Sequence, residues 1–437
     1  MSPRTRIRLF CILVLLLATD KASSSSATPA TMPSVAAANT GATQNGALKI
    51  VFSDLDGTLI HYPVGSGDDD VGNDTSEANT GVLEFPPSST GLKGVISTKT
   101  LSLVRTIRKG GNSGTNVKFV LVSGMRTPTL LQRLPYLPRA DAYCSENGGR
   151  IFYPIGSDED GGENGNGHDD VFWVTPHRFR DEGNDKHSDD DGYFRPFGIR
   201  EDLDWKRTME EAMTGIHEPE DSHSYSSFGS AKLQQVADDP SSPASTVPLE
   251  ERSGLLWDLA RELATKGIAT DIKGYATCFR VNQKQQSNTA NRIDQLALLL
   301  EEPPWNAATD GNRIVSSVNL KCVDFYPSCS GKKNCCLYLA KKFFPEDCAA
   351  HGRSSGGRSA PEDFLSRHAV CLCDDDNDLE MALACSHAYL PDVSSATMGD
   401  AIQNSRYEGR FTVTRSSSIE GINASDLALE TIVSDRL

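Results

Sequence analysis

Residues 48–58 read LKIVFSDLDGT and combine a short apolar run with two closely spaced aspartates. The run LKIVFS is short and rich in β-branched and aromatic residues, which predicts a buried strand. Asp54 and Asp56 follow, and because the chain leaves the strand between them, both carboxylates can face one crevice. Gly57 permits the sharp turn that this needs, and Thr58 adds a hydroxyl and a backbone N–H. Ligands of open parallel sheets bind beyond the carboxyl ends of the strands, so the segment predicts a ligand site.

Two later strands end in polar residues of the same kind. Residues 117–122 (VKFVLV) lead into Ser123, and residues 369–373 (AVCLC) lead into Asp374. Residues 98–109 have helical spacing and precede the first of these strands. Strand, helix and strand joined by short connections predict a parallel α/β sheet.

The ends of these strands gather four carboxylates in one place. Four anions cannot stay crowded and ionised without a cation. A hard divalent ion with oxygen ligands is therefore expected, and Mg²⁺ fits best. The expected metal-site residues are Asp54, Asp56, Asp374 and Asp378.

The chain changes character in its middle. Residues 156–170 (GSDEDGGENGNGHDD) are acidic and of low complexity, whereas periodic segments on their carboxyl side predict an α+β module. After that module the first pattern resumes. The predicted organisation is an α/β core split into residues 47–154 and 321–437, with an inserted domain at 155–320.

At this point the motifs resemble those of the haloacid dehalogenase (HAD) superfamily. DLDGT at 54–58 resembles its first motif and Ser123 its second, while Asp374 with Asn377 and Asp378 resembles its fourth. For the third motif we choose Lys333 over Lys332, because Leu337 then falls where the family pattern has a Leu. The resemblance implies a Rossmann-like HAD core with a C2 cap, most similar to Cof-type and sucrose-phosphatase-like members.

The resemblance also implies a role for each matching residue. Asp54 would be the nucleophile that takes the phosphoryl group, and Asp56 the acid/base. Mg²⁺ would be held by Asp374, the Asp54 carboxylate and the Asp56 backbone carbonyl, with Asp378 nearby. The expected phosphate-binding residues are Thr58, Ser123, Gly124 and Lys333.

Substrate contacts are expected from a different set of residues. Arg126 is displaced by one position from the family's Ser/Thr-Gly-Arg pattern, so its side chain need not point where the family Arg does. The segment at 273–280 of the inserted domain (KGYATCFR) offers two cations, although its aromatic residues also suit a domain core. ENG at 146–148 is expected to be a structural turn before the cap. The substrate candidates are Arg126, Asn377, Lys273 and Arg280.

Charge and the N-terminus limit partners and location. A net charge of −16 on 437 residues argues against non-specific nucleic-acid binding, although a local Lys or a metal still permits a phosphate ligand. Residues 1–22 have the basic, apolar and small-residue order of a signal peptide, with no later apolar run of spanning length. Residues 23–46 suit a disordered linker or a transit segment. We expect the secretory pathway or the exterior, with a plastid reached through signal plus transit segment as the alternative.

The expected function is a Mg²⁺-dependent phosphatase acting on a small sugar or polyol phosphate. Three alternatives stay open: a phosphomutase of the phosphomannomutase type, a catalytically silent binding protein with the same fold, and a secreted structural glycoprotein carrying sugars on Asn73 and Asn423. A zinc site or disulfides in the cysteine-rich stretch at 329–348 are further alternatives.

Overall fold

The structure is a computed structural model that describes most of the chain beyond residue 45. The described residues are 46–62, 81–87, 93–111, 116–155, 171–177, 194–214, 247–282, 313–319, 322–350 and 359–437. The expected signal peptide at 1–22 and nearly all of 23–46 lie outside them, as does Asn73.

A nine-stranded sheet forms the core, in the order β14-β13-β12-β1-β4-β5-β6-β8-β7. The six strands from β14 to β5 are parallel, and β6, β8 and β7 continue the sheet antiparallel. The strands are β1 (Ile50–Ser53), β4 (Lys118–Val122), β5 (Ala142–Ser145), β6 (Arg150–Ile155), β7 (Phe172–Val174), β8 (Phe197–Glu201), β12 (Ala369–Leu372), β13 (His387–Leu390) and β14 (Phe411–Val413). The predicted α/β class with a parallel central sheet is confirmed.

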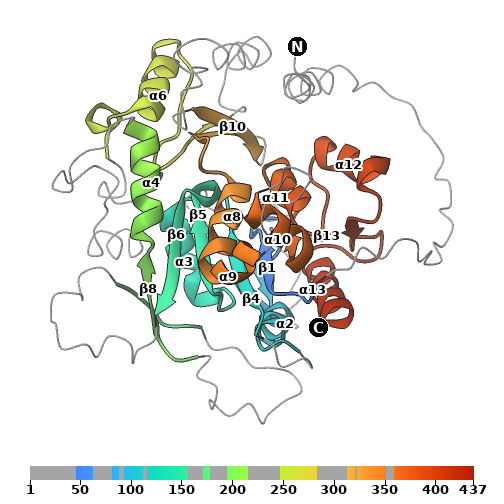
Figure 1. Ribbon diagram of the computed structural model, residues 1–437. Coiled ribbons are helices and arrows are strands. Elements are labelled where there is room, and N and C mark those ends of the chain that lie inside the picture. The colour runs from blue at the N-terminus through green and yellow to red at the C-terminus, as the bar shows by residue number, and fades with distance from the viewer. Residues whose placement is uncertain are drawn as a thin grey trace, which may run out of the picture.

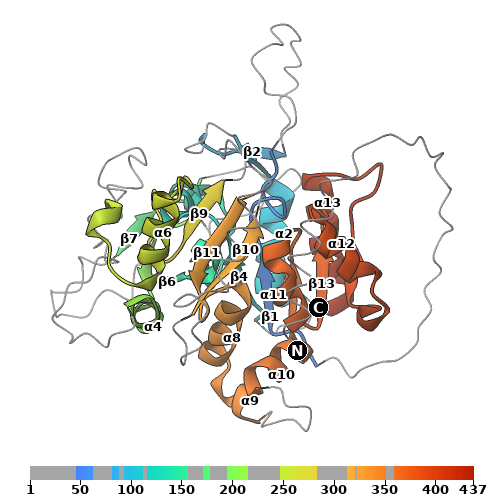
Figure 2. The same cartoon turned by 90° about the horizontal axis from the view of Figure 1, so that it is seen from above.

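Helices cover both faces of this sheet, as Figure 2 shows from above. Strand β1 alternates between the faces: Val51 packs in one apolar cluster, and Ile50 and Phe52 pack in the other. Successive strand residues point to opposite faces, so both faces need cover. One cover comprises α2 (Thr98–Arg108), α3 (Thr127–Arg133) and α13 (Ile422–Arg436); the other comprises α8 (Lys332–Phe343), α9 (Pro345–Ala350), α10 (Ala360–His368) and α11 (Leu379–Ala384). Helix α12 (Ala396–Gln403) contributes Met398 to the second of these clusters.

A second, three-stranded antiparallel sheet belongs to the inserted domain. Its order is β10-β11-β9, with β9 (Phe279–Asn282), β10 (Ile314–Asn319) and β11 (Cys322–Pro327). Helix α6 (Leu255–Thr265) packs on it through a separate apolar cluster, and α4 (Leu203–Thr214) lies nearby. Figure 1 shows α6 and β10 above the core sheet. We call this unit the cap.

The cap differs from the expected 155–320 at both ends. Strands β7 and β8 hydrogen-bond onto the core sheet through β6, so the core reaches beyond residue 155. Strand β11 pairs with β9 and β10, so the cap continues past residue 321. A composition change marked the insertion, but strand pairing sets its limits.

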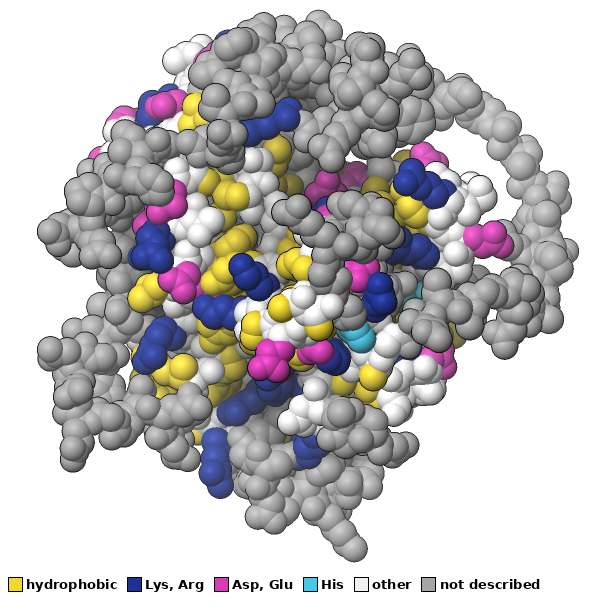
Figure 3. Space-filling model, in the orientation of Figure 1, with side chains coloured by type: hydrophobic (Ala, Val, Ile, Leu, Met, Phe, Trp, Pro, Cys, Tyr) yellow, Lys and Arg dark blue, Asp and Glu magenta, His cyan; other side chains and the backbone are white. Residues whose placement is uncertain are grey.

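Smaller elements complete the described part. A hairpin pairs β2 (Val82–Glu84) with β3 (Val95–Ser97). Short 3₁₀ turns are η1 (Leu134–Tyr136), η2 (Glu146–Gly148), η6 (Leu249–Glu251), η8 (Asp376–Asp378) and η9 (Ser405–Tyr407). No helix within the described ranges is long and apolar enough to cross a membrane. On the face in Figure 3, Lys and Arg side chains are interspersed with Asp and Glu.

Candidate active site

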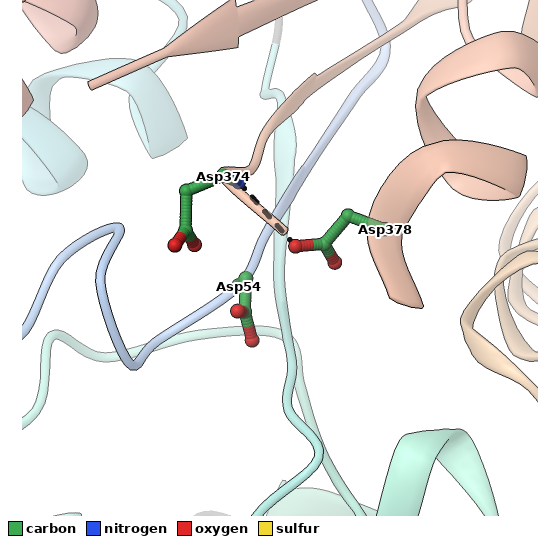
Figure 4. Close-up of side chains that lie close together, drawn as sticks. All are labelled: Asp54, Asp374 and Asp378. Carbon is green, nitrogen blue, oxygen red and sulfur yellow. Dashed lines mark hydrogen bonds between the residues drawn. The ribbon is translucent and has the colours of Figure 1, made fainter. Parts of the chain in front are cut away.

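Adjacent parallel strands bring the first and fourth motifs together. In the pair β1 and β12, Ser53 lies opposite Leu372, so Asp54 and Asp374 leave the sheet at the same edge. The Asp54 backbone N–H donates to the Leu372 carbonyl at 3.0 Å. Carboxylate oxygens of Asp54, Asp374 and Asp378 all lie within 4.8 Å of one another (Figure 4). Among the residues that the structure describes, they are the one group of acidic, His or Cys side chains close enough to share a metal ion.

Lys332, not Lys333, supplies the cation beside these carboxylates. The Lys332 Nζ lies 2.8 Å from Asp54 Oδ1 and 2.6 Å from Asp378 Oδ1, and its side chain is 1% exposed. Lys333 instead pairs with Glu362 at 2.9 Å near the surface. The assignment of Lys333 was therefore wrong by one residue. Helix α8 begins at Lys332, directly after Gly331 with φ 96°, and this start turns the first lysine inward.

Burial and mutual repulsion shape the charges of the cluster. Burial raises the pKa of Asp54 to about 8. Lys332 opposes this rise, and the charges of Asp378 and Asp56 add to it. Burial, then repulsion from Asp54 and Asp378, raises the pKa of Asp374 well above its usual range. Burial opposes the charge on Lys332, but Asp378 and Asp54 outweigh it and raise its pKa, so the ammonium stays charged.

This donor set fits a divalent cation. One ammonium faces three buried carboxylates, which leaves uncompensated negative charge when all three ionise. Hard carboxylate oxygens are the ligands that Mg²⁺ takes in proteins. The Asp56 carboxylate lies outside the group, so a contribution of Asp56 through its backbone carbonyl stays a prediction.

The turn after β1 is held against Asp374. The Thr58 hydroxyl donates to Asp374 Oδ1 at 2.8 Å, so the residue expected to bind phosphate orients a metal-site carboxylate. Gly57 has φ 85°, and a Cβ there would lie 2.4 Å from Asp374 Oδ2. Only glycine permits this approach, as the sequence indicated.

Ser123 and Gly124 follow β4 at the neighbouring strand end. Ser123 is buried, and its Oγ accepts from the Met125 backbone N–H at 3.1 Å. A Cβ on Gly124 would lie 2.3 Å from Asn319 Nδ2 and 2.9 Å from Asn147 Oδ1. Asn377 donates to Asn147 Oδ1 at 3.1 Å and so joins the same place. The backbone of Gly124 therefore faces a set of amide groups from both core and cap.

The candidate substrate residues are mostly engaged with the cap. Arg280 forms a bidentate ion pair with the fully buried Asp324. Its Nε donates to Oδ1 at 2.6 Å and its Nη2 to Oδ2 at 2.8 Å. Asp324 also accepts from Asn147 at 3.0 Å, so the pair lies against the core. Arg126 pairs with Asp271 and lies over the Tyr275 ring. Lys273 occupies the turn between Asp271 and Gly274, where its backbone N–H donates to Asp271.

The ENG turn joins the core to the cap. Glu146 and Asn147 both have φ 56°, a conformation that residues other than glycine rarely adopt. Glu146 accepts from the backbone N–H groups of Ala276 and Thr277 at 2.8 and 2.7 Å, and from the Thr127 hydroxyl at 2.6 Å. The ENG segment therefore forms a structural turn, as the sequence indicated.

Two side chains that no sequence motif marks bind Asp56. Arg133 Nη1 donates to Asp56 Oδ1 at 2.8 Å, and the Tyr62 hydroxyl donates to the same oxygen at 2.5 Å. Arg133 is the last residue of α3, and no motif in the sequence distinguishes it from an ordinary helix-end cation.

Comparison with known proteins gives structural matches alone. No family model matches the chain, and neither does any curated protein. The solved structures that match include a sucrose-phosphatase from Synechocystis sp. PCC6803, solved with sucrose and phosphate (11% identity, 89% of this chain, 98% of that chain, TM-score 0.39). A haloacid dehalogenase-like hydrolase from Bacillus subtilis matches at 12% identity over 89% of this chain and 92% of that chain, with a TM-score of 0.39.

A third match is trehalose-6-phosphate phosphatase from Aspergillus fumigatus (11% identity, 89% of this chain, 93% of that chain, TM-score 0.34). Two of these three proteins are described as phosphatases, and one as a haloacid dehalogenase-like hydrolase. At TM-scores this low, the similarity does not assign a function to this chain. The functional conclusion therefore rests on the residues of the site.

Proposed function

We propose that the chain is a Mg²⁺-dependent phosphatase of the HAD type, which hydrolyses a small sugar or polyol phosphate through an aspartyl-phosphate. One observation carries the proposal: Asp54, Lys332, Asp374 and Asp378 converge at adjacent strand ends, with Asp56 two residues beyond Asp54. Phosphoryl transfer needs in-line positioning and neutralised charge. Asp54 would supply the attacking oxygen, and Lys332 together with a bound cation would supply the neutralising charge.

The residues divide the reaction into two steps. A carboxylate oxygen of Asp54 attacks phosphorus, the bond to the leaving oxygen breaks, and Asp56 gives that oxygen a proton. Asp56 then takes a proton from water, whose oxygen attacks phosphorus and releases Asp54. Bound by Asp54, Asp374 and Asp378, Mg²⁺ would offset charge on the phosphoryl oxygens.

Side chains from both core and cap favour a polar leaving group. Asn147, Asn319 and Asn377 meet at Gly124, and Arg280 with Asp324 lies beside them. Amide and guanidinium groups form directional hydrogen bonds with hydroxyls, which suits a sugar or polyol better than an apolar group.

Phosphate release by the purified protein tests the proposal. We expect turnover of some phosphorylated sugars or polyols with Mg²⁺, its loss with EDTA, and its loss in Asp54→Asn. Migration of the phosphoryl group without release would instead show a phosphomutase. Binding of phosphorylated metabolites without either reaction would show a silent binding protein.

We also propose entry into the secretory pathway through residues 1–22, with export or plastid import as the destination. The support is the order of basic, apolar and small residues in that segment. Microscopy of the full-length chain with a C-terminal tag tests it. A diffuse cytosolic signal would contradict both destinations.

A further inference from the structure

Asp56 is held by two side chains, one from its own turn and one from another segment of the core. Tyr62 lies six residues further along the turn after β1, and Arg133 is the last residue of α3. Arg133 Nη2 also donates to the Tyr62 hydroxyl at 2.9 Å, which closes a triangle with Asp56. Three mutually bonded groups fix one another more firmly than any single bond does.

Both donors reach the same carboxylate oxygen. Arg133 and Tyr62 each donate to Oδ1, and no described residue donates to Oδ2. A purely structural Arg–Asp pair commonly uses both oxygens, as the Arg280–Asp324 pair in this chain does. Asp56 keeps 17% of its side-chain surface exposed, whereas Arg133 keeps 3%, so the anchor is buried and the carboxylate is accessible.

The anchor is itself rigid. The Arg133 guanidinium lies 5.5 Å from the Phe85 ring centroid and 5.8 Å from that of Tyr62, so aromatic faces enclose the cation. Burial, together with the Asp56 carboxylate and against the opposing effect of Arg133, raises the pKa of Tyr62, which keeps its hydroxyl a proton donor. The oxygen that Arg133 and Tyr62 bind is therefore fixed before substrate arrives.

We propose that Arg133 and Tyr62 are positioning residues that hold the Asp56 carboxylate by Oδ1 and leave Oδ2 to transfer the proton. The inference rests on the proposed phosphatase function. In the first step the proton on Oδ2 passes to the leaving oxygen as its bond to phosphorus breaks. In the second step Oδ2 takes a proton from the attacking water.

The test compares leaving groups. A poor leaving group such as the alkoxide of glycerol 2-phosphate needs a proton from Asp56, whereas p-nitrophenolate leaves without one. General acid catalysis contributes about 10²–10⁴-fold. We expect Arg133→Met to lower kcat/KM for glycerol 2-phosphate by about 100-fold or more, and for p-nitrophenyl phosphate by less than about 10-fold. Tyr62→Phe should show the same pattern with a smaller loss, and Arg133→Lys should restore part of it.

Arg150→Met is the matched control. Arg150 is 2% exposed and bonds both oxygens of Glu201 at 2.7 Å, so it is a buried arginine with a carboxylate partner of its own. This variant should lower thermal stability and keep the wild-type ratio of the two kcat/KM values. The positioning role would be overturned if Arg133→Met and Tyr62→Phe stay folded by circular dichroism and lose kcat/KM equally on both substrates. In that case the activity of the wild-type protein would still support the proposed phosphatase function. Wild-type protein inactive on all phosphate esters would instead overturn the proposed function, and this inference with it.

Discussion

Replacing Lys332 with methionine removes one charge from the centre of the site. Its ammonium lies 2.8 Å from Asp54 and 2.6 Å from Asp378, and the two carboxylate side chains are 7% and 0% exposed. Methionine keeps most of the apolar stem but leaves two buried carboxylates facing each other. Removing one partner of a buried ion pair costs about 3–5 kcal/mol, because the remaining charge is uncompensated.

Lys333→Met is the matched control in the next position. Its ammonium pairs with Glu362 at 2.9 Å, and the two side chains are 32% and 29% exposed. Pairs of this kind contribute about 0.2–1 kcal/mol. The same substitution on the same helical turn therefore separates the site charge from a surface charge.

Urea unfolding and phosphate release measure the two effects. We expect Lys332→Met to lose about 3–5 kcal/mol of unfolding free energy. Its kcat should fall about 100-fold or more, because a fixed charge facing the phosphoryl group is lost. Lys333→Met should stay within about 1 kcal/mol of wild type with kcat nearly unchanged. The reverse order, with Lys333→Met inactive and Lys332→Met active, would refute the placement of Lys332.

Three further expectations follow from the same contacts. Gly124→Ala should lower kcat/KM by about tenfold or more, because its Cβ would lie 2.3 Å from Asn319 Nδ2 and would displace the cap. Gly399→Ala is the control, because its Cβ meets nothing within 4 Å, and equal activity of the two variants would contradict the cap displacement. Mg²⁺ should raise Tm more at pH 8 than at pH 6. Burial raises the pKa of Asp54 to about 8, and Asp54 must lose its proton to bind the ion. Calorimetry that shows the same rise in Tm at both pH values would contradict the metal site. Burial lowers the pKa of His387 from 6.5 to about 4, so its neutral form stabilises the fold above pH 6.5, and that stability is lost as pH falls towards 4. The Tm of His387→Gln should therefore fall less than the Tm of wild type between pH 7 and 4.5, and an equal fall would contradict this role of His387.

Much of the core followed from local pattern. The apolar run before Asp54 and the run before Asp374 are short and bounded, and each forms a strand of the predicted parallel sheet. Because parallel strands end at one edge, the meeting of Asp54, Asp374 and Asp378 was predictable without knowledge of the fold's details.

Other features depended on geometry that the sequence does not display. Lys332 and Lys333 are chemically alike, and the choice between them rests on where α8 begins after Gly331. Arg133 looks like an ordinary helix-end cation until α3 is placed beside the turn carrying Asp56. The buried Asp324, which binds Arg280, carries no sequence signal that separates it from a solvated acid.

In the proposed mechanism Asp54 carries the phosphoryl group during turnover. Acid quenching in the steady state, followed by mass spectrometry of peptides containing Asp54, tests it directly. The expected result is a phosphoryl group on Asp54 that disappears when substrate is exhausted and accumulates in Asp56→Asn, which lacks the base for its hydrolysis. Phosphate release without a phosphoryl group on Asp54, together with full activity in Asp54→Asn, would contradict the mechanism.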